Sequence, residues 1–316
     1  RDRVGVKPLY YYHKDNLFIF GSELKALVKH PEFEKQLNKD ALSMYLQFGY
    51  IHAPYTIYEH THKLLAGHYI QYELSSNTFK TVKYWDIIDY YMMEKLEISE
   101  TEAEKQLEAI LIDSFNLRMV ADVPVGAFLS GGVDSSLVVG MLGQVSDGAI
   151  KTHCVGFEEA ELDERQYARV VAEQVGSDHQ DASINIDVAS CLDKIVWHMD
   201  EPFADSSVIP TYFVCREAKK RVTVCLSGDG GDEIFAGYDW YAELLRLQYY
   251  DQKVPDIVGK ISGILAPALD KASLRGATLL HNMGLSSSQR HRNLTRHFTP
   301  HQLRDLLVDG VPNNPV

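Results

Sequence analysis

From Ser99 onward, short apolar runs alternate with segments of helical periodicity, and this alternation restricts the possible folds more than any other feature of the chain. Strands that alternate with helices form right-handed βαβ units, which produce a parallel sheet with helices on both faces. The predicted strands are residues 123–129, 151–157 and 222–226, and the predicted helices are residues 134–142, 164–175, 187–199 and 207–219. A Ser99–Glu102 capping box is predicted to start a further helix before them. Ligands of such sheets bind beyond the carboxyl ends of the strands, so functional residues are expected there.

Residues 1–92 differ from the rest, because aromatic and aliphatic residues form short strand-like runs there. Strands are predicted at residues 9–12, 17–20 and 68–72, with Asp15–Asn16 as the turn between the first two, and a helix is predicted at residues 40–47. The chain of 316 residues begins at Arg1 without an initiator Met, and we expect it to be a fragment of a longer protein. At about 150 residues per domain, the length indicates about two domains.

Composition limits the class of protein and of partner. With 45% hydrophobic and 24% charged residues the chain can form an ordinary core, which excludes a disordered protein. The net charge of −13 makes a nucleic acid an unexpected partner, so small-molecule substrates are expected. No apolar run reaches the roughly 18 residues of a membrane span. The four cysteines include no CxxC pair, so a reduced, cytoplasmic setting is expected.

Residues 130–136, Ser-Gly-Gly-Val-Asp-Ser-Ser, separate the first predicted strand from its helix. Glycines let the backbone approach an anion, hydroxyls donate hydrogen bonds, and the free N–H groups of a helix start favour negative charge. Asp134 would repel a phosphate unless a cation lay between them, and Mg²⁺, which prefers oxygen ligands, meets that need. The loop matches neither the Walker, the GxGxxG nor the GxSxG pattern. A plain helix N-cap is the alternative interpretation.

Residues 227–233, Ser-Gly-Asp-Gly-Gly-Asp-Glu, follow the last predicted strand. The carboxylates of Asp229, Asp232 and Glu233, within five positions of one another, would repel each other unless a cation or a base engaged them. A second metal ligand and a general base or substrate-orienting carboxylate would explain this cluster. An acidic surface turn is the alternative.

These two motifs resemble those of glutamine-dependent asparagine synthetases. Residues 130–136 are similar to the ATP loop of the PP-loop pyrophosphatases, which include GMP, NAD and argininosuccinate synthetases and some tRNA-modifying enzymes. Residues 227–238 are similar to the second signature of asparagine synthetases and β-lactam synthetases. Further similar segments are residues 162–164 and 200–207, and, for the end of the glutaminase domain, residues 1–10, 21–27 and 66–69.

The resemblance implies two parts. Residues 1–92 would be the C-terminal part of a class II glutamine amidotransferase domain, a β-rich fold of the N-terminal-nucleophile type. Residues 99–316 would be an asparagine synthetase domain of the PP-loop ATP pyrophosphatase (adenine nucleotide alpha hydrolase-like) fold, an α/β fold with a parallel sheet and helices on both faces. We expect this second domain to be truncated at its C-terminus.

The same resemblance implies a site for ATP and Mg²⁺. Asp134 and Asp232 would share the magnesium ion, and Val155 and Phe157 would flank the adenine. Asp229, where many family members carry Glu, would orient the substrate or accept a proton from ammonia, and Asp229 and Asp232 are the implied catalytic residues. The residues implied to bind ATP are Leu129, Ser130, Gly131, Gly132, Asp134, Ser135, Ser136, Val155, Phe157, Ser227 and Gly228.

The implied reaction amidates aspartate with ammonia, which the full-length protein would take from glutamine. A carboxylate oxygen attacks the α-phosphate of ATP to give β-aspartyl-adenylate and pyrophosphate, and ammonia then displaces AMP. Because a carboxylate is already a nucleophile, this chemistry requires a metal and backbone donors more than an acid/base pair. The cysteine nucleophile of the glutaminase and a basic segment for pyrophosphate are expected outside these residues, so we expect this chain to be inactive by itself.

Several alternatives stay open. The acceptor could be a sugar or peptide carboxylate, or the chain could be a tRNA-modifying enzyme or a non-catalytic ATP-binding module, although the net charge argues against tRNA. A homodimer is a possible assembly. His60 and His62 lack a third ligand at suitable spacing, which predicts a surface loop rather than a metal site. Residues 289–297, rich in Arg and His, predict a solvated helix face rather than a phosphate or tRNA site.

Overall fold

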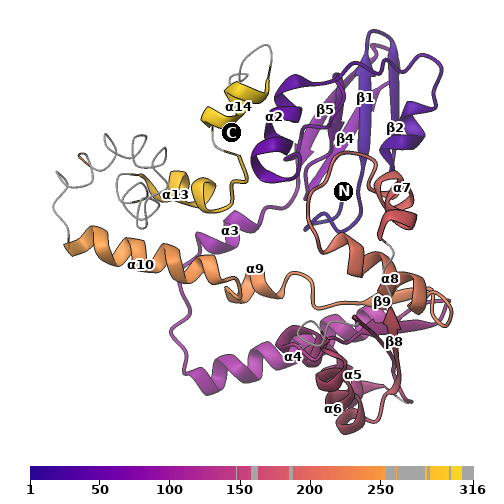
Figure 1. Ribbon diagram of the computed structural model, residues 1–316, viewed down its shortest axis with the longest axis vertical. Coiled ribbons are helices and arrows are strands. Elements are labelled where there is room, and N and C mark those ends of the chain that lie inside the picture. The colour runs from indigo at the N-terminus through magenta and orange to yellow at the C-terminus, as the bar shows by residue number, and fades with distance from the viewer. Residues whose placement is uncertain are drawn as a thin grey trace. The chain divides into compact units, whose positions relative to one another are not determined.

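Residues 1–228 form one compact unit and residues 229–308 form a second in the computed structural model (Figure 1). The structure describes residues 1–146, 148–157, 163–184, 188–253, 261, 282, 285–298 and 300–307. No helix in the described ranges is long and apolar enough to cross a membrane.

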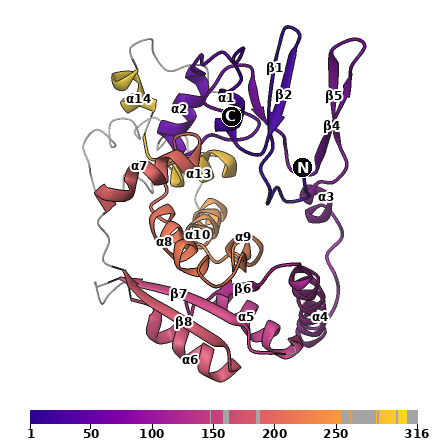
Figure 2. The ribbon, with the colours of Figure 1, turned by 90° about the vertical axis from the view of Figure 1, so that its right-hand side faces the viewer.

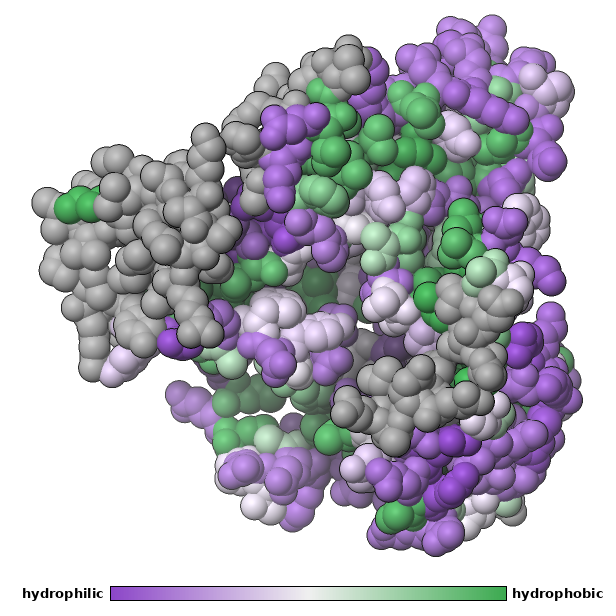
Figure 3. Space-filling model, viewed as in Figure 1, coloured by the Kyte–Doolittle hydropathy of each residue, from purple (hydrophilic) through white to green (hydrophobic). Residues whose placement is uncertain are grey.

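The first unit begins with two small antiparallel sheets. One has the strand order β2-β1-β3, with β1 at Tyr10–Lys14, β2 at Leu17–Gly21 and β3 at Thr61–Lys63, and the other pairs β4 (His68–Glu73) with β5 (Thr78–Lys83). The predicted hairpin is confirmed, because Lys14 pairs with Leu17 and Asp15 adopts the positive φ of 51° that this turn requires. Figure 3 shows that hydrophilic side chains cover the outer end of the β1–β2 hairpin.

Three helices accompany these strands: α1 (Leu24–Val28), α2 (Lys39–Phe48) and α3 (Ile87–Tyr91). The predicted helix at residues 40–47 is confirmed as α2. It begins where the side chain of Asn38 accepts a hydrogen bond from the Ala41 amide, and it ends at Gly49, whose φ of 79° closes the last turn. Two buried clusters, which include Leu24 and Ala41 in one and Tyr12 and Phe33 in the other, hold α1 and α2 against the first sheet.

A four-stranded sheet with the order β8-β7-β6-β9 follows, and every pair in it is parallel. The strands are β6 (Val125–Phe128), β7 (Lys151–Phe157), β8 (Asp178–Ile184) and β9 (Val224–Leu226), and the helices between them are α5 (Val133–Val145), α6 (Arg165–Val175), α7 (Val188–Met199) and α8 (Val208–Ala218). In Figure 2, α5 and α6 lie on one side of the sheet and α8 lies on the other. The predicted parallel sheet with helices on both faces is therefore confirmed.

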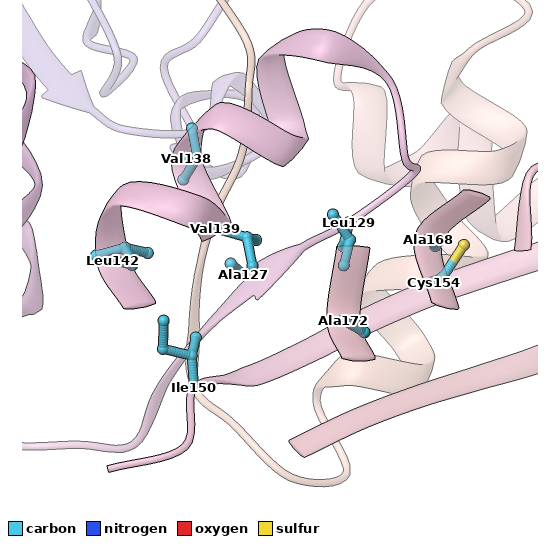
Figure 4. Packing of buried hydrophobic residues seen from close by; sticks show 9 residues of the cluster. All are labelled: Ala127, Leu129, Val138, Val139, Leu142, Ile150, Cys154, Ala168 and Ala172. Carbon is cyan, nitrogen blue, oxygen red and sulfur yellow. The ribbon is translucent and has the colours of Figure 1, made fainter. Parts of the chain in front are cut away.

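The core of this α/β part lies between the sheet and the helices α5 and α6 (Figure 4). Ala127 and Leu129 from the first strand segment meet Val139 and Leu142 of α5, and Cys154 of β7 meets Ala168 of α6. Burial raises the pKa of the Cys154 thiol to about 11, so this sulfur is an unreactive core group. Val155 points to the opposite face of β7 and packs against a second cluster formed by Ile184, Ile195 and Phe213.

The helix α4 (Glu100–Met119) precedes the sheet. Its predicted start is confirmed, since the Ser99 hydroxyl accepts a hydrogen bond from the Glu102 amide, but the Glu102 carboxylate accepts a bond from the Gln106 side chain, one turn further on. The apolar side chains of α4 are only partly buried. Ile110 is 65% exposed, whereas Phe115 and Met119, near the C-terminal end of the helix, pack against the core.

The second unit contains the helices α9 (Gly231–Phe235), α10 (Asp239–Lys253), α13 (Ser287–Leu294) and α14 (Pro300–Leu306). The prediction of a solvated helix face at residues 289–297 is wrong for Arg290, which is 4% exposed and donates a hydrogen bond from its Nε to the Asn282 carbonyl, 2.6 Å away. His291 packs edge-on against Trp240 of α10, with the ring centroids 4.8 Å apart. Tertiary packing between α10 and α13 therefore covers part of this basic segment.

The surface-loop prediction for residues 60–62 is confirmed for His60, which is exposed in a turn, and is wrong for Thr61 and His62, which lie in β3. Thr61 is 2% exposed and begins β3, and the ring of His62 lies 5.3 Å from the ring of Tyr11. The strand pairing of β3 with β1 buries these side chains, which a short polar segment does not reveal. Among the described residues, no group of three or more His, Cys, Asp or Glu side chains is arranged to hold a metal ion.

Candidate functional site

The loop at residues 129–136 joins the carboxyl end of β6 to the start of α5. Leu129 is 1% exposed and belongs to the core, and its amide donates a hydrogen bond to the His153 carbonyl, 2.9 Å away. A ligand can therefore reach Leu129 only through its backbone. The buried leucine anchors the first residue of the loop, and the residues that follow it are half-buried or exposed.

Hydrogen bonds within this loop hold its shape. The hydroxyl oxygens of Ser130 and Ser135 lie 3.0 Å apart, the Gly132 amide donates to Ser130 Oγ, and the Ser130 amide donates to Ser135 Oγ. Ser136 Oγ is different, because it is buried and has no hydrogen-bond partner among the described residues. A buried hydroxyl without a partner is costly, and a ligand oxygen or a cation at the loop would satisfy it.

The start of α5 is open to an anion. Gly132 is the N-cap residue and supplies no side-chain cap, so the first amides of the helix have no side-chain acceptor within the described part of the chain. The helix dipole adds partial positive charge at this point. Asp134 lies in this first turn, where its carboxylate would oppose a phosphate unless a cation were held between the two.

Gly131 is required for both its conformation and its small size. Its φ of +87° is unfavourable for residues with a side chain, and an added Cβ would lie 2.5 Å from Tyr167 Cβ and 2.6 Å from the Ala168 amide nitrogen. The loop therefore packs directly on the first turn of α6. This contact leaves no space for any side chain at position 131.

The second motif meets the first at the neighbouring strand end. β9 pairs with β6 so that Leu226 lies opposite Ala127, and Ser227 and Gly228 continue from it. A Cβ added at Gly228 would lie 2.8 Å from Asp134 Cβ and 3.0 Å from the Ser135 amide nitrogen. The structure thus places Gly228, near the start of the second motif, against the first motif at the carboxyl edge of the sheet, where ligands of parallel α/β folds bind.

The carboxyl end of β7 forms the next part of this edge. Val155 is half-buried on the side of α8, and Phe157 is the last residue of the strand, in register with Ile184 of β8. Asp163 and Arg165 form a two-point ion pair with both nitrogen to oxygen distances at 2.7 Å, and their side chains lie over Gly156. The Arg165 guanidinium lowers the pKa of Asp163 to about 2, so this carboxylate is charged at neutral pH.

Asp229 and Asp232 belong to the second unit, where α9 follows Gly230, whose φ is +94°. Asp232 lies in the first turn of α9, and its carbonyl accepts a hydrogen bond from the Gly237 amide, 3.0 Å away. A Cβ added at Gly237 would collide with Asp232 Oδ1. The chain therefore folds back over the Asp232 carboxylate, and Asp232 Oδ1 lies next to Gly237.

Tyr238 completes this turn. Its hydroxyl donates a hydrogen bond to Glu233 Oε1 at 2.7 Å, and this bond raises the pKa of Tyr238 to about 12. Neither Gly237 nor Tyr238 was expected from the sequence to act on the acidic cluster, although both lie in the motif at residues 227–238. Their roles depend on how the chain returns after α9, which the sequence does not reveal.

The residues present fit a magnesium ion in their chemistry. The Asp134 carboxylate and the partnerless Ser136 hydroxyl are oxygen ligands of the kind that Mg²⁺ prefers. Asp134 lies in the first unit and Asp232 in the second, so their sharing of one ion stays a prediction. The assignment of individual residues to ATP and to catalysis likewise stays a prediction.

A parallel sheet with a serine- and glycine-rich loop between its first strand and helix defines an α/β domain of the PP-loop class. The sequence profile of the asparagine synthase family matches residues 106–308, and that of the glutamine amidotransferase domain matches residues 1–85. The chain therefore belongs to the asparagine synthase family.

Curated relatives agree with this membership. A putative asparagine synthetase [glutamine-hydrolyzing] 2 of Methanocaldococcus jannaschii is 40% identical over 286 residues, which cover 89% of this chain and 54% of the relative. The asparagine synthetase [glutamine-hydrolyzing] 1 of Bacillus subtilis is 34% identical over 318 aligned residues, 99% of this chain and 48% of the relative. Amidase chyE of Penicillium rubens is 29% identical over 265 residues, 78% of this chain and 38% of the relative. The chain spans about half the length of the first two.

Proposed function

We propose that this chain supplies the synthetase machinery of a glutamine-dependent asparagine synthetase, which uses ATP to amidate aspartate. The observation that carries the proposal is the packing of Gly228 against Asp134, since it joins two oxygen-rich, glycine-rich loops at one edge of a parallel sheet. The names of the relatives support glutamine as the nitrogen source and aspartate as the acceptor. Residues 1–92 would form the C-terminal part of the amidotransferase domain and residues 99–316 the synthetase domain. A cytoplasmic location stays a prediction.

The first loop would bind the phosphates of ATP. Backbone amides at the start of α5 and the hydroxyls of Ser130, Ser135 and Ser136 would donate to phosphate oxygens, and Gly131 and Gly132 would permit their close approach. Val155 and Phe157 would flank the adenine, and Leu129, Ser227 and Gly228 would contact the nucleotide. A magnesium ion held by Asp134 and Asp232 would neutralise charge on the leaving pyrophosphate.

The reaction would proceed in two displacements. An oxygen of the aspartate side chain forms a bond to the α-phosphorus while the bond to the β-phosphate oxygen breaks, which gives β-aspartyl-adenylate and pyrophosphate. The nitrogen of ammonia then bonds to the acyl carbon, and AMP leaves with the oxygen that aspartate contributed. Asp229 would orient the acceptor or accept the proton that the attacking nitrogen loses.

An isotope experiment on the full-length protein tests this proposal. Aspartate with ¹⁸O in its side-chain carboxylate should transfer one labelled oxygen to AMP, with pyrophosphate released in equal amount and ammonium accepted as nitrogen source. Release of ADP, or AMP without label, would contradict the adenylate route. The matched control omits aspartate, and pyrophosphate release should then stop.

A different acceptor is the second candidate. The chain is also similar to a protein named amidase chyE, and a sugar or peptide carboxylate is the alternative acceptor. Pyrophosphate release that fails with aspartate but proceeds with such a carboxylate would favour it. A PP-loop tRNA-modifying enzyme is the further alternative, and the net charge of −13 argues against it.

A further inference from the structure

The carboxylate of Asp200 caps a helix far away in the sequence. Its Oδ2 accepts a hydrogen bond from the Leu24 amide at 2.6 Å, and its Oδ1 accepts one from the Lys25 amide at 3.3 Å, across 176 and 175 residues. These amides begin α1, whose own N-cap residue, Glu23, makes no side-chain cap. The loop after α7 therefore supplies the N-cap that the local sequence of α1 lacks.

The same carboxylate also forms an ion pair. Lys25 Nζ lies 2.7 Å from Asp200 Oδ1 and 4.7 Å from the centroid of the Trp197 ring on α7. The Asp200 side chain is only 6% exposed, so a carboxylate without these partners would be costly there. Asp200 moreover has a φ of +66°, a left-handed conformation that residues with a side chain rarely adopt. The cap and the ion pair stabilise this conformation.

Glu201 makes a second attachment next to the first. It forms an ion pair with Lys63 of β3, and Lys63 Nζ also donates a hydrogen bond to the Ile51 carbonyl at 2.6 Å. Three residues further on, the Ala204 amide donates to the Gly49 carbonyl at 2.8 Å. The loop between α7 and α8 is thus fixed to α1, to β3 and to the end of α2.

This loop leads directly into α8, which packs against β7. Val208, Ile209 and Tyr212 of α8 pack in the same cluster as Val155 of β7. A shift of the loop would therefore move the first turn of α8, and with it the packing around Val155. Close-packed interiors transmit such shifts because they contain few voids.

We propose that Asp200 and Glu201 form a two-point clamp through which residues 1–92 set the position of α8 and so of the wall of the nucleotide site at Val155. Asp200 is a positioning residue in this arrangement, because it acts through α8. The part of the inference that concerns nucleotide rests on the proposed function, whereas the clamp itself rests only on the contacts above.

Amide hydrogen exchange of the protein without ligand tests the clamp. In Lys25→Met, which keeps the aliphatic stem, and in Asp200→Asn, which keeps an acceptor for the cap, amides of α1 and of α8 should both exchange about tenfold faster. Lys25→Arg should restore the slow exchange in α8. The control Lys14→Met removes an ion pair with Glu34 in the same N-terminal region and should leave α8 unchanged. Unchanged exchange of α8 in both clamp variants, with far-UV circular dichroism showing a folded chain, would overturn the proposal.

A second measurement separates the clamp from the proposed function. Calorimetric titration with magnesium and ATP should show affinity reduced about three- to tenfold in Lys25→Met and restored in Lys25→Arg, whereas Lys14→Met binds as the unmodified protein does. If the unmodified protein binds no nucleotide, the proposed function fails, and the exchange experiment still decides the clamp. If nucleotide binds and Lys25→Met leaves its affinity unchanged, the link to Val155 is wrong.

Discussion

Gly228 packs against Asp134 so closely that a Cβ at position 228 would lie 2.8 Å from the Cβ of the aspartate. The two residues are 94 positions apart in the sequence, and the parallel pairing of β6 with β9 brings them together. Each follows the carboxyl end of its strand, and each belongs to a different glycine-rich motif. The contact joins the start of the second motif to the first loop.

Substitution of Gly228 by Ala should therefore disturb the first loop. The new methyl group meets Asp134 Cβ and the Ser135 amide, both part of the helix start, so we expect a loss of about 1–3 kcal/mol in unfolding free energy and weaker binding of ATP. Gly140→Ala is the matched control, because that glycine lies in α5 with no atom within 4 Å of the added Cβ, and it should stabilise the protein by about 0.5–1 kcal/mol. Urea unfolding and calorimetric titration measure both. Normal ATP affinity in Gly228→Ala would contradict a role for this contact in ATP binding.

Gly131→Ala combines a conformational cost with a collision, and Gly176→Ala separates the two. Gly176 ends α6 at a φ of +71° with open space around it, so Ala there should cost only the left-handed strain, about 1–2 kcal/mol. Gly131→Ala should cost about 1–3 kcal/mol more, because Tyr167 and the Ala168 amide leave no space. Equal unfolding free energies for the two variants would show that the loop does not pack on α6 in solution.

Gly237→Ala should affect catalysis more than stability. The atom that its Cβ would meet is Asp232 Oδ1, the end of a short side chain that can rotate away at little cost to folding. Under the proposed function the displaced carboxylate would no longer hold the metal, so pyrophosphate release by the full-length protein should fall at least about tenfold. We expect the melting temperature to change by no more than a few degrees. A large loss of stability with an unchanged rate constant in the folded fraction would contradict this prediction.

The Tyr238–Glu233 hydrogen bond predicts a late-titrating tyrosine. The bond raises the pKa of Tyr238 from 10.0 to about 12, so the folded protein retains a proton that the unfolded chain loses. Its contribution to stability is complete below pH 10 and disappears as the pH rises from 10 to about 12. Ultraviolet absorbance against pH should show this group, and Glu233→Gln should move its midpoint back toward 10.0.

Tyr238→Phe supplies the control for that titration. This variant should lack one of the tyrosines that lose their proton near pH 12 in the absorbance titration. Another should remain, because burial beside Glu201 and Asp200 also raises the pKa of Tyr10 to about 12. An absorbance curve that does not change in either variant would falsify the assigned hydrogen bond.

Local sequence predicted most of the α/β elements well. The run at residues 151–157 became β7 without change of bounds, and the helix predicted at residues 187–199 corresponds to α7 (Val188–Met199). β8 was not predicted. It begins with the polar residues Asp178-His179-Gln180-Asp181, which do not predict a strand. Pairing with β7 along its whole length stabilises β8.

At the candidate site, sequence reasoning identified the two motifs and their place after strands, since glycine, serine and aspartate in such turns have direct chemical meaning. It could not identify Gly237 and Tyr238 as neighbours of the acidic side chains, because their roles depend on how the chain returns after α9. The sequence also implied that Leu129 binds ATP, but it did not reveal that the Leu129 side chain is buried in the core. Only the backbone of this residue could therefore contact a ligand.

The sequence by itself determined the α/β class, the order of most elements and the two loops rich in glycine and oxygen ligands, because periodicity and turn chemistry are local properties. The tertiary structure decided which loops meet, and it alone attached Asp200 to Leu24 and Lys25 across the chain. Such contacts depend on strand pairing and on the burial of charged side chains, which bring together residues that are far apart in the sequence. A motif therefore predicts its chemistry, whereas the residues that contact it in space are identified only by the tertiary structure.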